Sequence, residues 1–198
     1  MSSRNKGRVI VLSGPSGAGK TTLHDLLLTS ARFQGRIVRS ISATTRKPRG
    51  TEQHGREYLF LTIAMFESKI RRGHFLEWAR VFDNYYGTPM KNVRDILKSG
   101  RHVLLCIDVQ GGKQVKDKVP EAISIFVKTP SVEELRRRLE SRGTDSHESV
   151  ALRLKTAARE LTEARHYDHV IINDDLPRAF AELEKVLVAA LGLRGSVS

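Results

Sequence analysis

Cysteine is almost missing from this chain, with Cys106 the only one among 198 residues. A single thiol excludes an internal disulfide framework and a cysteine-based metal cluster. The seven histidines include no pair in the ligand spacing H-x-x-x-H. No apolar run approaches the roughly 18 residues of a membrane helix, and the polar Met1–Gly7 segment does not resemble a secretory signal peptide. We therefore expect a cytoplasmic protein with no membrane partner.

Acidic residues are also scarce, because 22 Asp and Glu stand against 34 Lys and Arg, for a net charge of +12. Such an excess can hold phosphorylated small molecules, bind nucleic acid, or form a solvated surface. The chain lacks a separate basic tail and the aromatic stripe, interleaved with arginine, that an RNA-binding sheet shows. We expect no specific nucleic-acid partner, although weak binding at low salt follows from the charge alone.

The chain does contain a regular alternation of strand and helix patterns. Short apolar runs, each followed by a helical pattern or a turn, lie at residues 9–12, 103–108, 123–127 and 170–172. Helical spacings follow Ser131 (a capping box with Glu134), Ser146, and Pro177, the last ending near Gly192. This order predicts an α/β fold with a parallel sheet flanked by helices, in a single domain.

The most informative motif is the run Gly14-Pro15-Ser16-Gly17-Ala18-Gly19-Lys20-Thr21, which matches G-x-x-x-x-G-K-[ST]. It joins a buried-strand pattern to a helix, so successive backbone N–H groups and the helix dipole converge on one point. We expect Lys20 to reach the outer phosphates of a nucleoside triphosphate, and the Thr21 hydroxyl to complete the shell of a Mg²⁺ ion. The alternative is a glycine-rich turn with a chance lysine.

Residues 35–88 interrupt the alternation and predict a small mixed lobe inserted into the core. They hold one helical pattern, at Ile63, Phe66 and Ile70, between short strand-like segments at 58–60 and 75–79. They also hold three of the four tyrosines and the only tryptophan. An enzyme that transfers a phosphoryl group must hold a second substrate away from water, so this lobe is where we expect the acceptor.

Two arginines in this lobe, Arg46 and Arg49, are three residues apart beside Pro48. Two guanidinium groups at that spacing can converge on one phosphate, although an ordinary surface pair remains an equal alternative. Tyr58 and Tyr86 can each donate a phenolic hydrogen bond to the same phosphate, or simply pack.

These features together resemble the guanylate kinase family over nearly the whole chain. The resemblance rests on GPSGAGKTT at 14–22, SATTRKPR at 42–49, EWA at 77–79, NYYGT at 84–88, IDVQG at 107–111, PSVEELRRRLESRGTD at 130–145 and NDD at 173–175. The TTRxPR, EWA and NxYGT elements are more specific than the phosphate loop. The resemblance implies a P-loop kinase core at about 1–34, 89–135 and 154–198, a GMP-binding lobe at 35–88 and a helical lid at 136–153.

The same resemblance implies a reaction and assigns residues to it. The reaction is the Mg²⁺-dependent transfer of the ATP γ-phosphoryl group to GMP, with dGMP as a further acceptor, in purine nucleotide metabolism. The residues implied for ATP are 14–22 (ending in Lys20, Thr21 and Thr22) and Asn173. Those implied for GMP are Ser42, Arg46, Arg49, Glu52, Tyr58, Glu77, Tyr86, Thr88 and Asp108. Lys20, Arg46 and the lid arginines Arg138, Arg142 and Arg153 are the implied catalytic set.

Three positions depart from the family pattern, and three other interpretations remain open. Cys106 replaces a frequent acidic residue, and Thr51 and Asp83 each replace a frequent glycine. A protein-interaction module of the same fold commonly loses the phosphate-loop or lid residues, which this chain keeps. A kinase for another acceptor would not need Glu77. A nucleic-acid binder would have to keep its affinity for a duplex at physiological salt. The sequence does not decide between a monomer and a homodimer.

Overall fold

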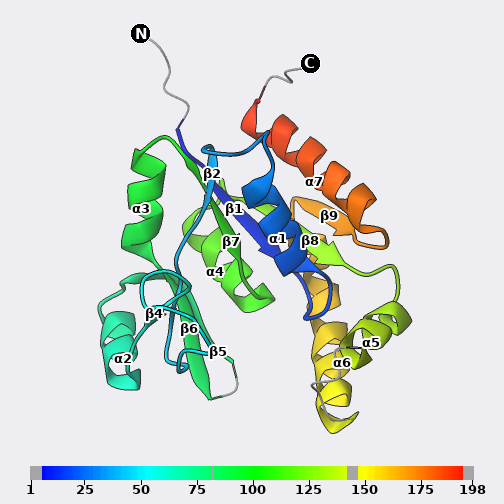
Figure 1. Ribbon diagram of the computed structural model, residues 1–198, viewed down its shortest axis with the longest axis horizontal. Coiled ribbons are helices and arrows are strands. Elements are labelled where there is room, and N and C mark those ends of the chain that lie inside the picture. Colours follow the sequence, from blue (N-terminus) through cyan, green and yellow to red (C-terminus); the bar gives the residue numbers. More distant parts are fainter. Residues whose placement is uncertain (1–5, 82, 142–146, 194–198) are drawn as a thin grey trace. The chain divides into compact units, whose positions relative to one another are not determined.

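The computed structural model describes residues 6–81, 83–141 and 147–193, with only the backbone at 147–149. The strands are β1 (Val9–Ser13), β2 (Ile37–Arg39), β3 (Ala43–Thr44), β4 (Leu59–Phe60), β5 (Phe75–Val81), β6 (Asn84–Pro89), β7 (His102–Cys106), β8 (Ile123–Lys128) and β9 (His169–Ile172). The helices are α1 (Lys20–Thr29), α2 (Ile63–Arg71), α3 (Met90–Lys98), α4 (Val109–Lys118), α5 (Val132–Glu140), α6 (His147–Thr162), the 3₁₀ helix η1 (Glu163–His166) and α7 (Leu176–Leu191) (Figure 1).

The chain divides into two compact units. The first unit contains residues up to 10, then 34–105 and 110–122; the second contains 11–33, 106–109 and 123 onward. Each unit has its own cluster of buried apolar side chains. Among the described helices, none combines the length and the apolar character needed to cross a membrane.

A five-stranded sheet has the strand order β2-β7-β1-β8-β9. The β2–β7 and β8–β9 pairs are parallel, and every residue of β1 is buried. The four strands predicted from apolar runs are all present, which confirms the α/β class. At the edge, β9 buries only Ile171, while its neighbours Val170 and Ile172 are 37% and 44% exposed. An edge strand is covered on fewer sides than a central one, so an apolar run there is only half buried.

The first unit contains a second, four-stranded sheet in the order β4-β3-β6-β5. Its core is centred on Phe66 of α2, which stacks on Phe75 at 4.3 Å and on Tyr85 at 5.3 Å between ring centroids. The Thr62 hydroxyl caps α2 by accepting a hydrogen bond from the Met65 N–H. The helix and the two strand-like segments predicted for residues 35–88 are thus present as α2, β4 and β5, and the sheet contains β3 and β6 in addition.

In the second unit, α5 and α6 lie side by side (Figure 1) and share the buried cluster Leu135, Leu139, Val150 and Ala157. The predicted capping box is present, since the Ser131 hydroxyl accepts a hydrogen bond from the Glu134 N–H at 3.1 Å. The last helix, α7, ends at Gly192 with a φ of 62°, a backbone conformation that favours glycine. The three helices predicted for this part of the chain are present as α5, α6 and α7.

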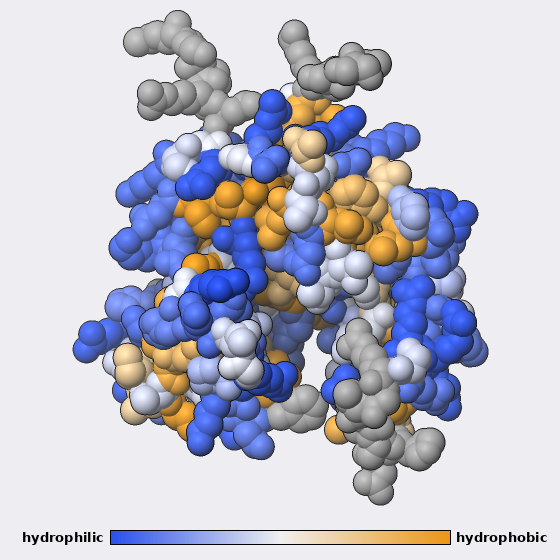
Figure 2. Space-filling view, viewed as in Figure 1, coloured by the Kyte–Doolittle hydropathy of each residue, from blue (hydrophilic) through white to orange (hydrophobic). Residues whose placement is uncertain are grey.

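Most of the face shown in Figure 2 carries hydrophilic side chains, in keeping with a chain in which 28% of the residues are charged. The basic run Arg136–Arg138 lies on α5, as the sequence predicted.

Candidate active site

The loop between β1 and α1 depends on its glycines. Gly14 and Gly19 have φ of 137° and 89°, conformations that L-residues rarely adopt. A methyl group at Gly14 would collide with the Val127 carbonyl oxygen, and one at Gly19 with the side-chain amide of Asn173. The chain therefore turns sharply from a buried strand into a helix, and the first-turn N–H groups of α1 point out of the loop.

Lys20 is the first residue of α1, and its ammonium group lies over the loop. The Nζ atom donates to the Gly14 carbonyl at 2.6 Å and to the Pro15 carbonyl at 2.8 Å. Behind it Leu23 and Leu27 are fully buried, which anchors the helix. Thr21 and Thr22 are exposed on the first turn, so their hydroxyl groups are accessible beside the lysine.

Asn173, directly after β9, supports this loop through hydrogen bonds. Its backbone N–H donates to the Lys128 carbonyl at 2.8 Å, and its side-chain Nδ2 donates to the Ala18 carbonyl at 2.8 Å. The residue is 4% exposed. The resemblance implies a nucleotide contact for Asn173, whereas the observed contact of its amide is with the loop backbone.

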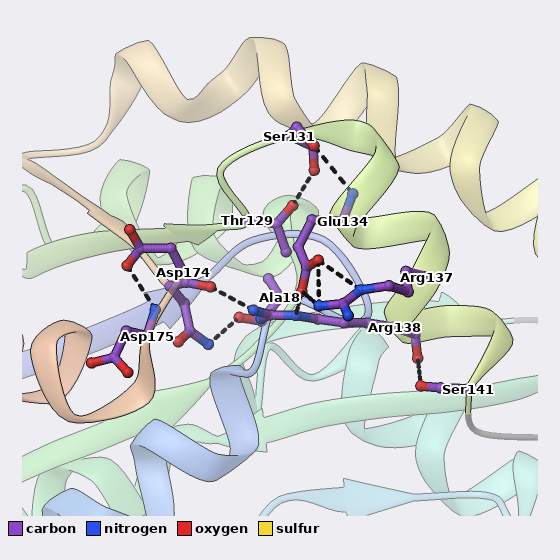
Figure 3. Close-up of polar contacts among 10 residues, drawn as sticks. Ala18, Thr129, Ser131, Glu134, Arg137, Arg138, Ser141, Asp174 and Asp175 are labelled. Carbon is purple, nitrogen blue, oxygen red and sulfur yellow. Dashed lines mark hydrogen bonds and ion pairs between the residues drawn. The ribbon is translucent and has the colours of Figure 1, made fainter.

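Arg138 on α5 also contacts Asn173, the residue that supports the phosphate loop (Figure 3). Its Nε donates to Glu134 Oε1 at 2.7 Å, and its Nη2 donates to the Asn173 carbonyl at 2.9 Å. The hydrogen bond from Arg138, followed by that from Arg137, holds the pKa of the Glu134 carboxyl below its ordinary value. Glu134 thus orients the guanidinium group that the resemblance places in the lid.

Of the other two lid arginines, Arg153 alone lies within the described residues. Arg153 is partly buried on α6. Arg142 lies outside the described residues.

Asp108 follows β7 in the second unit and lies among charged groups near the loop. Ile107, beside it, donates its N–H to the Leu12 carbonyl at 3.2 Å, which ties the end of β7 to β1. Burial raises the pKa of the Glu160 carboxyl on α6, the charge of Lys20 opposes this, and the charge of Asp108 adds to it. Sequence analysis did not single out Glu160, because no motif marks it and its neighbours Lys20 and Asp108 are distant in the sequence.

In the first unit, Arg46 and Glu52 form a two-pronged ion pair. Both hydrogen bonds, Nη1 to Oε2 and Nη2 to Oε1, measure 2.9 Å, and the Arg49 N–H donates to Glu52 Oε2 at 2.8 Å. The Arg46 hydrogen bond and then the Arg49 N–H hold the pKa of the Glu52 carboxyl below its ordinary value. The planar fork of the guanidinium group is thereby fixed in direction.

Aromatic rings surround this ion pair. The Arg46 guanidinium carbon lies 5.5 Å from the Tyr58 ring centroid and 6.0 Å from that of Phe60. Tyr58 and Tyr86 meet edge to face with their centroids 6.3 Å apart. The structure therefore brings Arg46, Glu52, Tyr58 and Tyr86 together, and Arg49 contributes its backbone N–H from an exposed position.

A buried carboxylate lies on the neighbouring strands of this sheet. Glu77 on β5 faces Thr88 on β6 in the strand register, and the Thr88 hydroxyl donates to Glu77 Oε1 at 2.6 Å. Glu77 is 4% exposed and Thr88 is fully buried. Ser42 precedes β3, where its carbonyl accepts from the Leu59 N–H at 2.9 Å, and its side chain is half-buried.

A phosphate loop between a buried strand and a helix, together with a second sheet of four strands, is typical of P-loop kinases. A family model described as guanylate kinase matches residues 6–190. The guanylate kinase of Myxococcus xanthus is 47% identical over 92% of this chain and 87% of the relative. That of Caldanaerobacter subterraneus is 44% identical over 96% of this chain and 90% of the relative. The crystal structure of guanylate kinase from Anaplasma phagocytophilum superimposes with a TM-score of 0.73 at 34% identity, covering 97% of this chain and 89% of the other. The chain belongs to the guanylate kinase family, and it is an enzyme.

Proposed function

We propose that this enzyme transfers the γ-phosphoryl group of ATP to GMP and to dGMP, giving ADP and GDP or dGDP. The observation that carries the choice of acceptor is the buried carboxylate of Glu77, oriented by the Thr88 hydroxyl at 2.6 Å. Guanine presents the N1–H and N2–H₂ donors side by side, and one carboxylate accepts both. Adenine has no donor at N1, so AMP cannot offer the carboxylate the two adjacent donors that guanine offers.

The acceptor phosphate is assigned to the cluster of Arg46, Arg49, Tyr58 and Tyr86. Glu52 holds the Arg46 guanidinium through two hydrogen bonds, so its direction is set before the substrate arrives. Because Glu52 remains ionised well below neutral pH, the pair is intact under working conditions. Ser42 is also assigned to guanine, and the resemblance implies the same role for Asp108. Acceptance of dGMP alongside GMP is part of the same proposal.

The donor phosphates are assigned to the loop from Gly14 to Thr22. The Lys20 ammonium lies within hydrogen-bond distance of the loop carbonyls and would turn toward the β- and γ-phosphates when these arrive. The exposed Thr21 hydroxyl suits Mg²⁺, which binds few protein oxygens and takes its other ligands from phosphate and water. In the described part of the chain no cluster of three or more His, Cys, Asp or Glu forms a separate metal cage.

The proposed chemistry requires no covalent intermediate on the enzyme. An oxygen of the GMP phosphate attacks the γ-phosphorus in line, while the charge that spreads over the phosphoryl oxygens is stabilised by Lys20, Arg138, Arg142 and Arg153. Bound Mg²⁺ neutralises part of the same charge. Arg138 already lies beside the loop that it would serve, held by Glu134 and by the Asn173 carbonyl. We also propose a role in purine nucleotide metabolism and a cytoplasmic location, which cell fractionation would test.

The test is ADP release from ATP and Mg²⁺ with GMP, dGMP, AMP, CMP or UMP supplied in turn. We expect turnover only with GMP and dGMP, and a fall of about 100-fold or more in kcat/KM for GMP in Glu77→Gln. Glu121→Gln is the matched control, because it makes the same change at an exposed position of the same unit. We expect this variant to keep the activity of the wild type. Absence of turnover with every acceptor, in folded protein, would favour an interaction module instead.

A further inference from the structure

The strand that carries Glu77 lies at the edge of its sheet, and side chains from α4 bond to its outer side. In the order β4-β3-β6-β5, strand β5 has a neighbouring strand on one side only. On the other side, Gln114 Oε1 accepts from the Trp78 N–H at 3.2 Å, and Gln114 Nε2 donates to the Trp78 carbonyl at 2.7 Å. One side-chain amide thus makes the pair of hydrogen bonds that a further strand would make.

Lys118, one turn further along α4, bonds to the same edge on the other side of Glu77. Its Nζ donates to the Leu76 carbonyl at 2.7 Å and to the Phe75 carbonyl at 3.3 Å. The register with β6 shifts between Phe75 and Glu77, so the two carbonyls lie at a β-bulge. A bulge changes the direction of the side chain that follows it, which here is Glu77.

The inner side of β5 is equally constrained next to Glu77. Trp78 pairs with Gly87 of β6, and a methyl group at Gly87 would come within 2.9 Å of the Glu77 carbonyl oxygen. Close packing on this side leaves the backbone at residues 76–78 little room to move inward. The hydrogen bonds from Gln114 and Lys118 oppose movement in the other direction, and all these residues belong to the first unit.

We propose that Gln114 and Lys118 are positioning residues that set the Glu77 carboxylate for recognition of the acceptor base. The inference rests on the proposed function, in which Glu77 accepts the guanine donors. Two donors on a planar base require the carboxylate plane to be aligned with the ring, and small rotations weaken both hydrogen bonds together. Helix α4 therefore contributes to acceptor specificity through the backbone of β5, with no contact to the base required.

A simpler role for the two side chains is protection of an exposed strand edge against pairing with another chain. The two roles predict different measurements. Edge protection affects stability and self-association, whereas positioning affects the preference for GMP over AMP. A positioning role also acts only while Glu77 retains its carboxylate.

The variants are Gln114→Ala, Lys118→Met and the conservative Lys118→Arg, with Lys113→Met as the matched control. Lys113 is exposed on the same helix, so its replacement removes the same charge without altering the edge. We expect Gln114→Ala and Lys118→Met to raise KM for GMP and lower the ratio of kcat/KM for GMP over AMP by about 5- to 10-fold each, the loss of one or two hydrogen bonds. KM for ATP should stay within about twofold, and Lys118→Arg should restore most of the ratio because Arg keeps its donors.

A double-mutant cycle with Glu77→Gln decides whether the effect passes through the carboxylate. In the Glu77→Gln background we expect Gln114→Ala to lower the GMP-to-AMP ratio by less than about twofold further. Hydrogen exchange at the Trp78 amide, and the fluorescence of this only tryptophan, report the strand edge independently of activity. Faster exchange together with an unchanged ratio would overturn the proposal and leave edge protection.

The test also separates this inference from the proposed function. A wild-type enzyme that ignores GMP, or a Glu77→Gln variant with full selectivity, contradicts the proposed function itself. A selective wild type that depends on Glu77, with Gln114 and Lys118 variants of unchanged selectivity, contradicts only the positioning role.

Discussion

The side-chain amide of Asn173 donates to the Ala18 carbonyl at 2.8 Å, in the middle of the phosphate loop. Asn173→Ala removes this donor and leaves a buried carbonyl without it. Such a loss costs about 1–3 kcal/mol of the free energy of unfolding. In a chain of this length, each kcal/mol lowers the melting temperature by about 2–4 °C. We expect a similar or larger loss in Asn173→Asp, because a carboxylate cannot donate and its charge faces the carbonyl oxygen.

The same variant tests whether Asn173 acts on the loop or on the base of the donor. A loosened loop binds every triphosphate less well, so KM should rise by a similar factor for ATP and for GTP used as donor, with KM for GMP unaltered. Asn92→Ala is the matched control, because Asn92 Nδ2 donates to the Ile41 carbonyl at 3.0 Å in the first unit. It should lower stability without altering KM for ATP. If Asn173→Ala left stability unchanged and raised KM for ATP but not for GTP, the role of Asn173 in supporting the loop would be refuted. That result would favour a contact between Asn173 and adenine.

Three further predictions concern charged groups. Lys20→Met should lower kcat by about 100-fold or more while the melting temperature changes little, and a near-normal rate would remove Lys20 from the catalytic set. Glu52→Gln should raise KM for GMP more than KM for ATP, because the Arg46 fork loses its anionic partner; equal effects on both would contradict that role. Burial lowers the pKa of His102, whose Nδ1 accepts from the Arg8 N–H at 3.1 Å. The unfolded chain then takes up the proton first, so stability should fall as pH drops below about 6.5, and His102→Asn should flatten that fall in thermal melts.

Local patterns were enough to predict much of the fold. The loop from Gly14 to Thr21 needs particular residues at fixed spacing, and the Ser131 cap and the Gly192 end of α7 are likewise local. Sequence did not predict β2, β3, β6, α3 or α4. Strand β6 contains Gly87 and ends at Pro89, and α4 contains adjacent glycines at 111–112, all of which lower local propensity. Packing within the first unit overrides that propensity.

Residue chemistry also predicted some of the acceptor cluster. The spacing of Arg46 and Arg49 pointed to a phosphate, whereas Glu52 and Glu77 came from the resemblance to guanylate kinases. The structure shows that Arg46 meets Glu52 and the rings of Tyr58 and Phe60, while Arg49 remains exposed with its backbone N–H engaged. Their roles in binding stay predictions.

The sequence by itself determined that this chain carries a phosphate loop on an α/β core, because that motif is contained in a few consecutive residues. Only the tertiary structure decided what supports the loop and the carboxylate. Asn173 meets Ala18 across 155 positions, and Gln114 meets Trp78 across 36. A side-chain amide pairs equally well with any backbone group it reaches, so its type does not identify its partner. The packing of α4 beside β5, and of the end of β9 beneath the loop, selected those partners.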